Sequence, residues 1–355
     1  QRLAVLRRLP ALREGRRAHL AMQIAREGGK PLPDAIVETT RAIDGVHNAA
    51  DELRNFAGRE IPMGLSAAAE NRWAFTTREP IGIVAAISAF NHPLNLIVHQ
   101  VVPAIAVGCP VIVKPAATTP LSCLEFVGLV HEAGLPEPWC QSFLPEGNEL
   151  AEKLATDKRI AFLSFIGSAR VGWSLHAKLA HGTRSALEHG GAAPAIVDRS
   201  ADLDKVIEPI VKGGYYHAGQ VCVSTQRIYV HHDIADDFTH RLVARVERLR
   251  TGDPTLKDTE VGPLILPREA ERVTEWIEEA VKGGARLASG GTRLSETTLQ
   301  PTVLLDPAAD ARVSTQEVFG PVVAVYRYGD LDDAIARANA LPTAFQASIF
   351  AQDID

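Results

Sequence analysis

Ile81-Gly82-Ile83-Val84-Ala85-Ala86-Ile87 is the stretch of sequence that decides the fold class. The run is apolar almost throughout, whereas a strand with one face in water alternates apolar and polar residues. It therefore predicts a strand of a parallel sheet that is covered on both faces. A helical segment that ends near Ala106 and a second apolar strand at residues 111–113 follow it, which begins an alternation of strands and helices.

The same alternation continues along the chain. Apolar strand patterns recur near residues 141–144 and 161–166, with helical patterns between them. Because strands that alternate with helices form open α/β sheets with right-handed crossovers, we expect a doubly wound parallel sheet. The length allows two domains. We expect the first at residues 1–60 and 81–190, and a second α/β domain at residues 191–355.

Residues 61–80 interrupt the alternation of strands and helices. Trp73 and Phe75 occupy alternate positions between Arg72 and Arg78, with proline and glycine residues on both sides, a pattern that is typical of strands. We expect a small inserted β-hairpin here. An apolar strand outside the main sheet needs a cover, and a second subunit is one way to supply it, so the hairpin is predicted to be an oligomerisation element.

The composition excludes several classes of function. The 355 residues carry a formal net charge of −6 with acids and bases interspersed, so no basic stripe is present to bind a nucleic-acid backbone. The most apolar window, residues 96–113, is interrupted by polar residues and prolines, which argues against a membrane span. We therefore expect a small-molecule partner, and neither nucleic acid nor a membrane.

The four cysteines give no sign of a metal centre or of a disulfide framework. Cys109, Cys123, Cys140 and Cys222 share no CxxC or metal-type spacing, and a chain of this size folds without disulfides. We therefore predict no metal site, a reducing compartment and a cytoplasmic location.

Residues 213–227 contain the strongest candidate for chemistry. Cys222 comes shortly after Gly219, in a turn between a helical pattern and a strand pattern, where backbone amides can point at a reacting atom. A thiolate in such a place is a good nucleophile toward carbonyl carbons. A lone cysteine of this kind is more often structural, so its interpretation depends on the rest of the chain.

Two glycine-rich strand ends add to this pattern. The strand at residues 161–166 runs into Gly167-Ser168-Ala169-Arg170-Val171-Gly172, after which a helical pattern begins. Glycine at such a corner lets a pyrophosphate approach the backbone, and the free amides of a helix start attract its charge. The spacing is not GxGxxG, so the signal is weak by itself. Glu188 ends the next strand, and a histidine and two glycines follow it.

Together these segments make the sequence similar to the NAD(P)-dependent aldehyde dehydrogenase superfamily over essentially its whole length. The resemblance implies a Rossmann-like cofactor domain at residues 1–60 and 81–190, the oligomerisation hairpin at residues 61–80, and a catalytic domain at residues 191–355. The matching segments are Ala89-Phe90-Asn91-His92-Pro93, Val113-Lys114-Pro115, Phe165-Ile166-Gly167-Ser168-Ala169-Arg170-Val171-Gly172, Leu187-Glu188-His189-Gly190-Gly191, Gly219-Gln220-Val221-Cys222, Gly252-Asp253-Pro254 and Gln316-Glu317-Val318-Phe319-Gly320-Pro321.

The resemblance also implies a mechanism. Cys222 would attack an aldehyde to form a thiohemiacetal, and the Asn91 side chain and the Cys222 backbone N–H would hold its oxyanion. Hydride transfer would leave a thioester. Glu188, with its pKa raised by partial burial, would activate the water that hydrolyses this thioester. From the residues alone, Asn91 is also explained as a helix cap, and Glu188 as an exposed carboxylate at a strand end.

The implied cofactor is NAD or NADP. Lys114 would meet the adenosine ribose or its 2′-phosphate, and Glu317 would meet the nicotinamide ribose. Ala117 stands where NAD-selective relatives often have a glutamate that grips the ribose, so neither dinucleotide is excluded. The implied cofactor-binding residues are Lys114, Gly167, Ser168, Gly172, Phe90, Glu317 and Phe319.

Departures from the family pattern keep alternatives open. His189 replaces a common leucine. Val221 replaces an arginine found in relatives that act on phosphorylated aldehydes, which favours an uncharged aldehyde. We find no Phe-Gly-Gly-containing C-terminal segment and interpret the chain as C-terminally incomplete. The alternatives are a CoA-acylating dehydrogenase and a non-catalytic cofactor-binding protein of the same fold, although Glu188 favours water as the acyl acceptor. We expect the full-length protein to be a homodimer or homotetramer.

Overall fold

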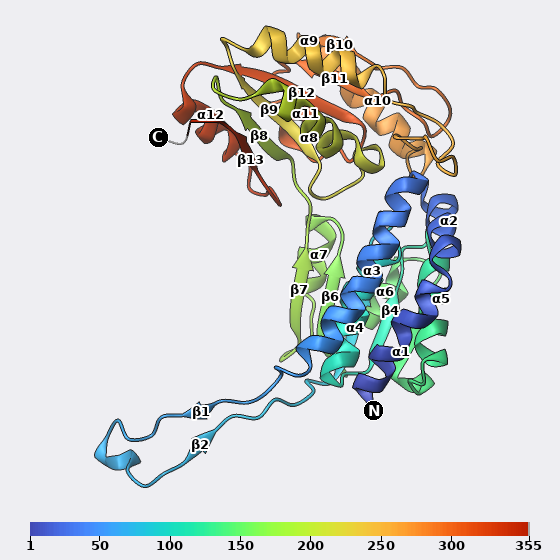
Figure 1. The fold of residues 1–355 in the computed structure, drawn as a ribbon, viewed down its shortest axis with the longest axis vertical. Helices are drawn as coiled ribbons and strands as arrows, with labels where there is room; N and C mark the ends of the chain where they lie inside the picture. The colour runs from blue at the N-terminus through green and yellow to red at the C-terminus, as the bar shows by residue number, and fades with distance from the viewer. Residues whose placement is uncertain (354–355) are drawn as a thin grey trace. The chain divides into compact units, whose positions relative to one another are not determined.

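The computed structural model describes residues 1–353 and divides into two compact α/β units (Figure 1). Residues 21–37, which the sequence analysis placed with the first domain, cluster with the second unit. One reason is that the Leu32 backbone N–H donates to the Pro254 carbonyl at 2.8 Å. Unit 1 comprises residues 1–20, 38–166 and 170–187, and unit 2 comprises residues 21–37, 167–169 and 188–355.

Unit 1 is built on a five-stranded sheet in the order β5-β4-β3-β6-β7. Strand β3 is parallel to both of its neighbours, and β4 is parallel to β5. In chain order this sheet reads 3-2-1-4-5, the doubly wound arrangement in which the strand order reverses beside the first strand. The predicted Rossmann-like sheet is therefore confirmed. Its strands are β3 (Ile83–Ile87), β4 (Val111–Lys114), β5 (Cys140–Ser142), β6 (Ile160–Ile166) and β7 (Arg184–Glu188).

The apolar run that predicted β3 is buried from Val84 to Ile87, as a strand covered on both faces requires. No helix of residues 1–353 is both long and apolar enough to cross a membrane. Helices α2 and α3 contribute residues to both units. The helices that begin in residues 1–187 are α1 (Arg2–Glu14), α2 (Arg17–Gly28), α3 (Leu32–Glu52), α4 (Asn95–Val107), α5 (Leu121–Glu132), α6 (Asn148–Thr156) and α7 (Ala169–His176), with 3-10 turns η1 (Ala67–Ala69) and η2 (Glu137–Trp139).

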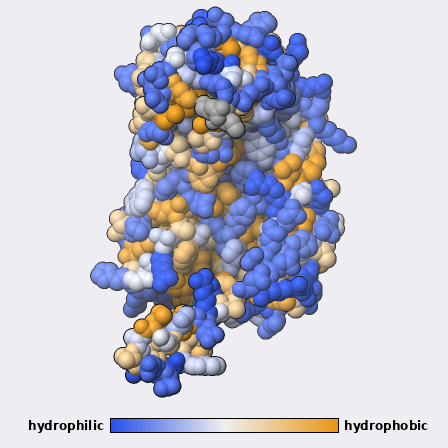
Figure 2. Space-filling model, turned by 60° about the vertical axis from the view of Figure 1, so that its left-hand side comes forward, coloured by the Kyte–Doolittle hydropathy of each residue, from blue (hydrophilic) through white to orange (hydrophobic). Residues whose placement is uncertain are grey.

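The inserted hairpin is present in unit 1. Strands β1 (Glu60–Ile61) and β2 (Ala74–Phe75) pair antiparallel. Apolar and polar residues lie side by side on this hairpin, which forms the lowest part of the view in Figure 2. Trp73 is 92% exposed, Leu65 is 88% exposed and Phe75 is 72% exposed. Such a cluster of large exposed apolar side chains is typical of a surface that contacts another molecule.

Unit 2 contains a six-stranded sheet in the order β10-β11-β12-β9-β8-β13. Strands β11, β12, β9, β8 and β13 run parallel, and β10 is antiparallel to β11. Strand β9 is central, and all seven of its residues are buried. The strands are β8 (Ala193–Val197), β9 (Thr225–His231), β10 (Arg286–Ser289), β11 (Thr302–Leu305), β12 (Val322–Tyr328) and β13 (Ser348–Phe350).

The helices of unit 2 pack their apolar residues on this sheet. Residues of α8, α9 and α10 form one buried cluster with residues of β8, β9, β11 and β12. The buried Arg227 of β9 has its guanidinium satisfied by backbone carbonyls, with 2.9 Å to Ala192 and 2.9 Å to Ala338. The helices are α8 (Leu203–Tyr215), η3 (Tyr216–Gly219), α9 (Ala235–Val246), α10 (Pro267–Lys282), α11 (Arg312–Thr315) and α12 (Leu331–Ala338).

Candidate active site

The candidate site of unit 2 lies at the amino ends of neighbouring parallel strands (Figure 1). Cys222 precedes β9, Glu317 precedes β12, and Gly190 and Gly191 precede β8. Because β12, β9 and β8 are adjacent and parallel, the loops before them meet at one edge of the sheet. The charges of Glu317 and Glu188 both act on the Cys222 thiol. Unit 2 therefore brings together three of the residues predicted from the sequence.

The segment before Cys222, residues 216–224, is called the cysteine loop below, and residues 316–321 form the Glu317 loop. His217, Ala218 and Gly219 have successive φ angles of 50°, 55° and 70°, in the left-handed region that non-glycine residues rarely enter. A Cβ on Gly219 would lie 2.0 Å from the carbonyl oxygen of Gly320. Only glycine therefore lets the two loops pack backbone against backbone.

Gln220 holds the cysteine loop in place. Its side chain is buried, and its Nε2 donates to the carbonyl oxygens of His217 and Pro263, each at 3.2 Å. Its Oε1 accepts from the Ile265 backbone N–H at 2.9 Å. A buried carboxamide whose donors and acceptor are all used resists displacement, because any movement leaves a polar group without a partner. Cys222 is thus placed on a rigid support.

Burial raises the pKa of the half-buried Cys222 thiol, and the negative charges of Glu317 and, more weakly, Glu188 raise it further. Backbone N–H groups of Cys222 and Val223 hydrogen-bond the sulfur and act in the opposite direction. The thiol is consequently the dominant form at neutral pH. Because the thiolate is the nucleophile, a base or the loss of a neighbouring negative charge is needed to generate it.

Glu317 is the most strongly perturbed carboxylate at this edge of the sheet. Burial raises its pKa to about 7, although a backbone hydrogen bond from Gly191 and the positive charge of Arg272 oppose this change. Its Oε1 is buried without a hydrogen-bond partner. A Cβ on Gly190 would lie only 1.9 Å from that oxygen. The carboxylate therefore occupies space that glycine leaves free, and it offers an acceptor to a hydroxyl group of a ligand.

Gln226 and Arg272 hold the Glu317 loop. The Nε2 of Gln226 donates to the Gln316 carbonyl at 2.7 Å, and its Oε1 accepts from the Val318 backbone N–H at 2.9 Å. The guanidinium of Arg272 donates to the Val318 carbonyl at 2.8 Å. Sequence reasoning missed Gln226. The available signal was a polar amide at the start of a predicted strand, because a polar group that such a strand buries is almost always hydrogen-bonded.

Glu188 ends β7 and is exposed, so the predicted partial burial of its side chain is wrong. The cause is that β7 is an edge strand of its sheet, in which exposed and half-covered residues alternate. Its backbone carbonyl accepts from the Gly167 N–H at 3.1 Å. His189, which replaces the common leucine, has its Nδ1 3.2 Å from the Gly167 carbonyl oxygen. These contacts fix the turn that contains Gly167 beside Glu188.

Unit 1 places its predicted residues at the carboxyl ends of parallel strands. Ile87 of β3 is paired with Lys114 of β4 and with Phe165 of β6. Phe90 and Asn91 follow β3. Gly167 and Ser168, which cluster with unit 2, follow β6 directly in the chain. Ligands of doubly wound sheets bind outside the carboxyl ends of the strands, where the strand order reverses. The predicted cofactor residues of unit 1 are therefore at the expected edge.

Asn91 is buried, and Glu38 caps the helix that follows it. The Oε1 of Glu38 accepts from the backbone N–H groups of Leu94 and Asn95, both at 3.0 Å. Glu38 also lies 3.5 Å from the His92 ring. The capping role considered for Asn91 is thus filled by Glu38 at these two N–H groups, which are those at the start of α4.

Lys114 ends β4, where burial lowers the pKa of its ammonium group. A half-buried cation at the carboxyl edge of a sheet attracts an anionic or polyhydroxylated ligand. Helix α7 begins immediately after Gly167 and Ser168, and Gly172 is buried within it. This strand-turn-helix arrangement suits a phosphate group, because the free amides of the helix start face the turn.

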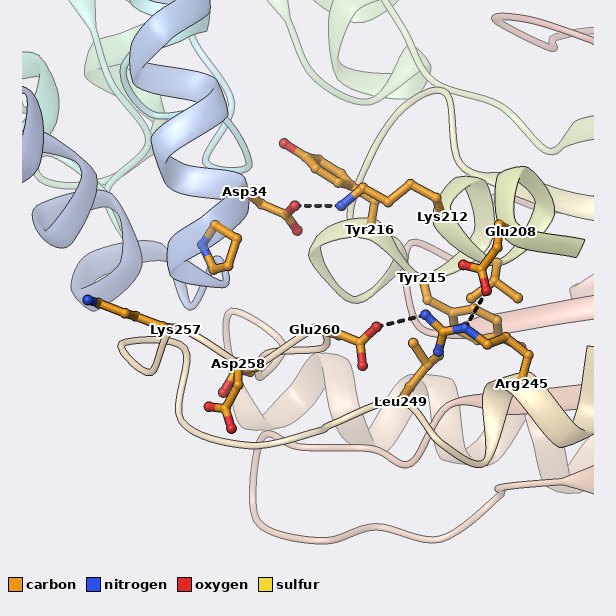
Figure 3. Close-up of a pocket in the computed structure, with 13 residues that line it drawn as sticks. Asp34, Glu208, Lys212, Tyr215, Tyr216, Arg245, Leu249, Lys257, Asp258 and Glu260 are labelled. Atoms are coloured by element: carbon orange, nitrogen blue, oxygen red, sulfur yellow. Dashed lines mark hydrogen bonds and ion pairs between the residues drawn. The ribbon is translucent and has the colours of Figure 1, made fainter.

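A separate pocket in unit 2 is drawn in Figure 3, and none of the residues predicted from the sequence lines it. Five of its charged groups pair with one another. The Nζ of Lys212 lies 2.6 Å from Asp34, and Arg245 lies 2.7 Å from Glu208 and 2.9 Å from Glu260. The Asp34–Lys212 pair joins the start of α3 to α8, which is a second reason why residues 21–37 cluster with unit 2.

One group of possible metal ligands occurs among residues 1–353, namely His231, His232 and Asp233. It lies at the carboxyl end of β9, opposite to Cys222, and two of its members are exposed. Asp233 is 3.5 Å from His231 and 3.0 Å from His232. These contacts hold the three side chains together.

Comparison with known proteins agrees with this geometry. Residues 1–355 match the aldehyde dehydrogenase family. The chain is 38% identical over 355 residues to 3-sulfolactaldehyde dehydrogenase of Priestia aryabhattai, covering all of this chain and 74% of that protein. Aldehyde dehydrogenase 21 of Physcomitrella patens, solved with the reaction product succinate, superposes with a TM-score of 0.96 at 38% identity, over 99% of this chain and 73% of that one.

A third relative adds a cofactor. Glyceraldehyde-3-phosphate dehydrogenase of Methanocaldococcus jannaschii, solved with NADP, has a TM-score of 0.94 at 33% identity, over 99% of this chain and 76% of that one. The chain belongs to the aldehyde dehydrogenase family, whose general reaction is the NAD(P)-dependent oxidation of aldehydes. The predicted family and enzyme class are confirmed, and the predicted cofactors, NAD or NADP, are those of the family.

Proposed function

We propose that this protein oxidises a small aldehyde to a carboxylic acid with NAD or NADP, through a thioester on Cys222. The observation that carries the proposal is the setting of Cys222 in unit 2. Its sulfur meets two backbone N–H groups and lies within the electrostatic reach of Glu317 and Glu188. Few structural cysteines have two carboxylates and two amides around them, whereas a nucleophile that must gain and lose a proton requires such groups.

In the first step Glu188 takes the proton of the Cys222 thiol and releases it to solvent. The thiolate sulfur then forms a bond to the carbonyl carbon, and the carbonyl oxygen becomes an oxyanion. The Cys222 backbone N–H and the Asn91 amide donate hydrogen bonds to that oxyanion. Bound NAD(P) supplies the acceptor for the hydride that leaves this carbon. As the hydride leaves, the carbon–oxygen double bond is restored, and Cys222 carries a thioester. Loss of one oxyanion donor typically lowers the rate by about 100-fold or more.

Hydrolysis of the thioester needs a base, and Glu188 is our candidate. Its carboxylate takes a proton from water, the resulting hydroxide attacks the thioester carbon, and the Cys222 sulfur leaves as thiolate. The exposed position of Glu188 at the end of β7 supports contact with water. A CoA-acylating enzyme has no need of this base, so Glu188 favours water as the acyl acceptor.

The residues present fit a dinucleotide. The unpartnered buried Oε1 of Glu317 suits a ribose hydroxyl donor, and the turn at Gly167 and Ser168 suits the pyrophosphate. Lys114 would hold the adenosine ribose or its 2′-phosphate, and we assign supporting contacts to Phe90, Gly172 and Phe319. Ala117 supplies no carboxylate to repel a 2′-phosphate, so both NAD and NADP are proposed. The two units would be the cofactor and catalytic domains.

The exposed apolar residues of the β1–β2 hairpin support a homodimer or homotetramer in which this surface is covered. A cytoplasmic location remains our prediction from the cysteine pattern.

An aldehyde panel assayed with NAD and with NADP tests the proposed reaction. We expect carboxylic acid and reduced dinucleotide in equal amounts, and no turnover by Cys222→Ala although its dinucleotide affinity is retained. A thioester product that appears only when coenzyme A is added would establish the acylating alternative. Full turnover by Cys222→Ala would remove the cysteine from the mechanism, and dinucleotide binding without turnover of any aldehyde by the parent would favour a non-catalytic role.

A further inference from the structure

Gln226 is the second residue of β9 and is 5% exposed. Its carboxamide makes three hydrogen bonds to backbone groups. The Nε2 donates to Val313 at 2.9 Å and to Gln316 at 2.7 Å, and the Oε1 accepts from Val318 at 2.9 Å. The Gln316 carbonyl and the Val318 N–H belong to the two peptide groups on either side of the Glu317 Cα. One side chain thus fixes the φ and ψ of Glu317.

We propose that Gln226 is a positioning residue that sets the Glu317 carboxylate for the nicotinamide ribose. The inference rests on the proposed role of Glu317 and adds the residue through which that role is maintained. Gln226 acts through the backbone of the Glu317 loop and is not assigned a contact with substrate or cofactor.

The Glu317 carboxylate needs such support. Its Oε1 is buried without a partner, which by itself favours rotation of the side chain toward water. Phe319, two residues further on, has a φ of 47°, an unfavourable backbone conformation for a non-glycine residue. A loop with a buried carboxylate and a strained neighbour stays in place only when surrounding contacts over-determine it. Gln226 supplies two of these contacts, on both sides of Glu317.

Gln226 also connects the two loops of the site. It lies in β9, four residues after Cys222 and just beyond the cysteine loop, and the Glu317 charge acts on the Cys222 thiol. The contact between Gly219 and Gly320 is a second connection between the same loops. Movement of Glu317 after loss of Gln226 should therefore be detectable at the Cys222 sulfur as well as in dinucleotide affinity.

A double-mutant cycle tests the proposal on the full chain, with Gln226→Met, Glu317→Ala and the double variant. Methionine has a similar length but forms none of the three hydrogen bonds. We expect Gln226→Met to weaken NAD or NADP binding, measured by calorimetry, by about 10-fold, and to have little further effect in the Glu317→Ala background. Tyr328→Phe is the control, because it removes a buried hydrogen bond of 3.3 Å to the Val197 carbonyl at the carboxyl end of β12, away from both loops.

The second readout is the pH dependence of Cys222 alkylation by iodoacetamide, which does not require turnover. The groups that act on this thiol are Glu317, Glu188 and the N–H groups of Cys222 and Val223. Both variants should lower the thiol pKa, because Glu317→Ala removes, and Gln226→Met displaces, the negative charge that raises this pKa most. Tyr328→Phe should leave the thiol pKa unchanged.

The outcomes separate the two proposals. If Glu317→Ala weakens dinucleotide binding and Gln226→Met does not, the positioning role of Gln226 is wrong and the proposed function stands. If Gln226→Met weakens binding equally with and without Glu317, its effect is a general structural one and the positioning role is again wrong. If Glu317→Ala binds dinucleotide like the parent, the role assigned to Glu317 fails, whatever Gln226→Met does.

Discussion

The Cα of Gly190 faces the Glu317 carboxylate so closely that an added methyl group would lie 1.9 Å from Oε1 and 2.6 Å from Cδ. The atoms it would meet are at the far end of a flexible side chain, so the fold can accept alanine while the carboxylate is displaced. This close approach links the turn before β8 to the loop before β12, and it makes Glu317 sensitive to a residue on another loop.

Gly190→Ala should therefore weaken dinucleotide binding without a large loss of stability. A displaced carboxylate loses its hydrogen bonds to ribose, which corresponds to about 10-fold to 100-fold in affinity. Calorimetric titration with NAD and NADP, together with the thermal midpoint, measures both quantities. Gly252→Ala is the matched control, because its added methyl group would meet nothing within 4 Å. An unchanged affinity in Gly190→Ala would contradict the assignment of Glu317 to the ribose.

The pH dependence of stability should report the buried Glu317. Its pKa is about 7 in the folded protein, against 4.5 for an ordinary glutamate. A carboxyl group whose pKa is raised by folding stabilises the folded state most when protonated, so its contribution is full below pH 4.5 and is lost as the pH rises to about 7, by about 3 kcal/mol at most.

Denaturant unfolding of the parent and of Glu317→Gln at several pH values tests this dependence. The variant should gain stability relative to the parent as the pH rises through this range. Glu275→Gln, at an exposed position of α10, should follow the parent. If the free energy of unfolding changed with pH in the same way for the parent and for Glu317→Gln, Glu317 would not be the group responsible.

Gln220→Ala should destabilise the protein through the cysteine loop. The substitution removes three buried hydrogen bonds and leaves the Ile265 N–H and the Pro263 carbonyl without these partners, whereas the His217 carbonyl still accepts from the backbone N–H of residue 220. The expected cost is about 2–4 kcal/mol. Chemical denaturation gives the change in the free energy of unfolding. The Cys222 alkylation rate should also change, since the loop that holds the sulfur is released. A variant as stable as the parent would mean that the loop is held by its left-handed backbone alone.

The exposed β1–β2 hairpin is predicted to contact a second subunit. Trp73→Ser and Phe75→Ser remove two side chains that are 92% and 72% exposed, so neither should lower the stability of an isolated chain by much. If the hairpin joins subunits, the double variant should have a smaller mass in sedimentation or light scattering than the parent. Leu256→Ser, at another exposed apolar position, is the control. An identical mass would remove the hairpin from the interface.

Local sequence patterns predicted much of this structure. The features that they did not predict depend on contacts between residues far apart in the chain. The apolar run at residues 81–87 identified β3, because a strand covered on both faces is apolar at nearly every position. Cys222 and Glu317 were identified from short segments that resemble a known family. The role of Gln226 was missed, because no local pattern reveals which loop will lie over the start of β9. The resemblance implied partial burial of Glu188, whereas its exposure, the alternative that the residues alone left open, depends on β7 lying at the edge of its sheet.

The cysteine loop and the start of β9 contain positions that can vary and positions that cannot. Gly219, Gln220 and Gln226 are fixed by backbone packing or by hydrogen bonds to backbone, whereas no side-chain hydrogen bond ties Val221 or Val223 to one identity. A library designed to change the accepted aldehyde should therefore diversify the two valines and keep the glycine and both glutamines. Such a library would change which aldehyde is accepted and would keep the residues that hold Cys222 and Glu317 in place.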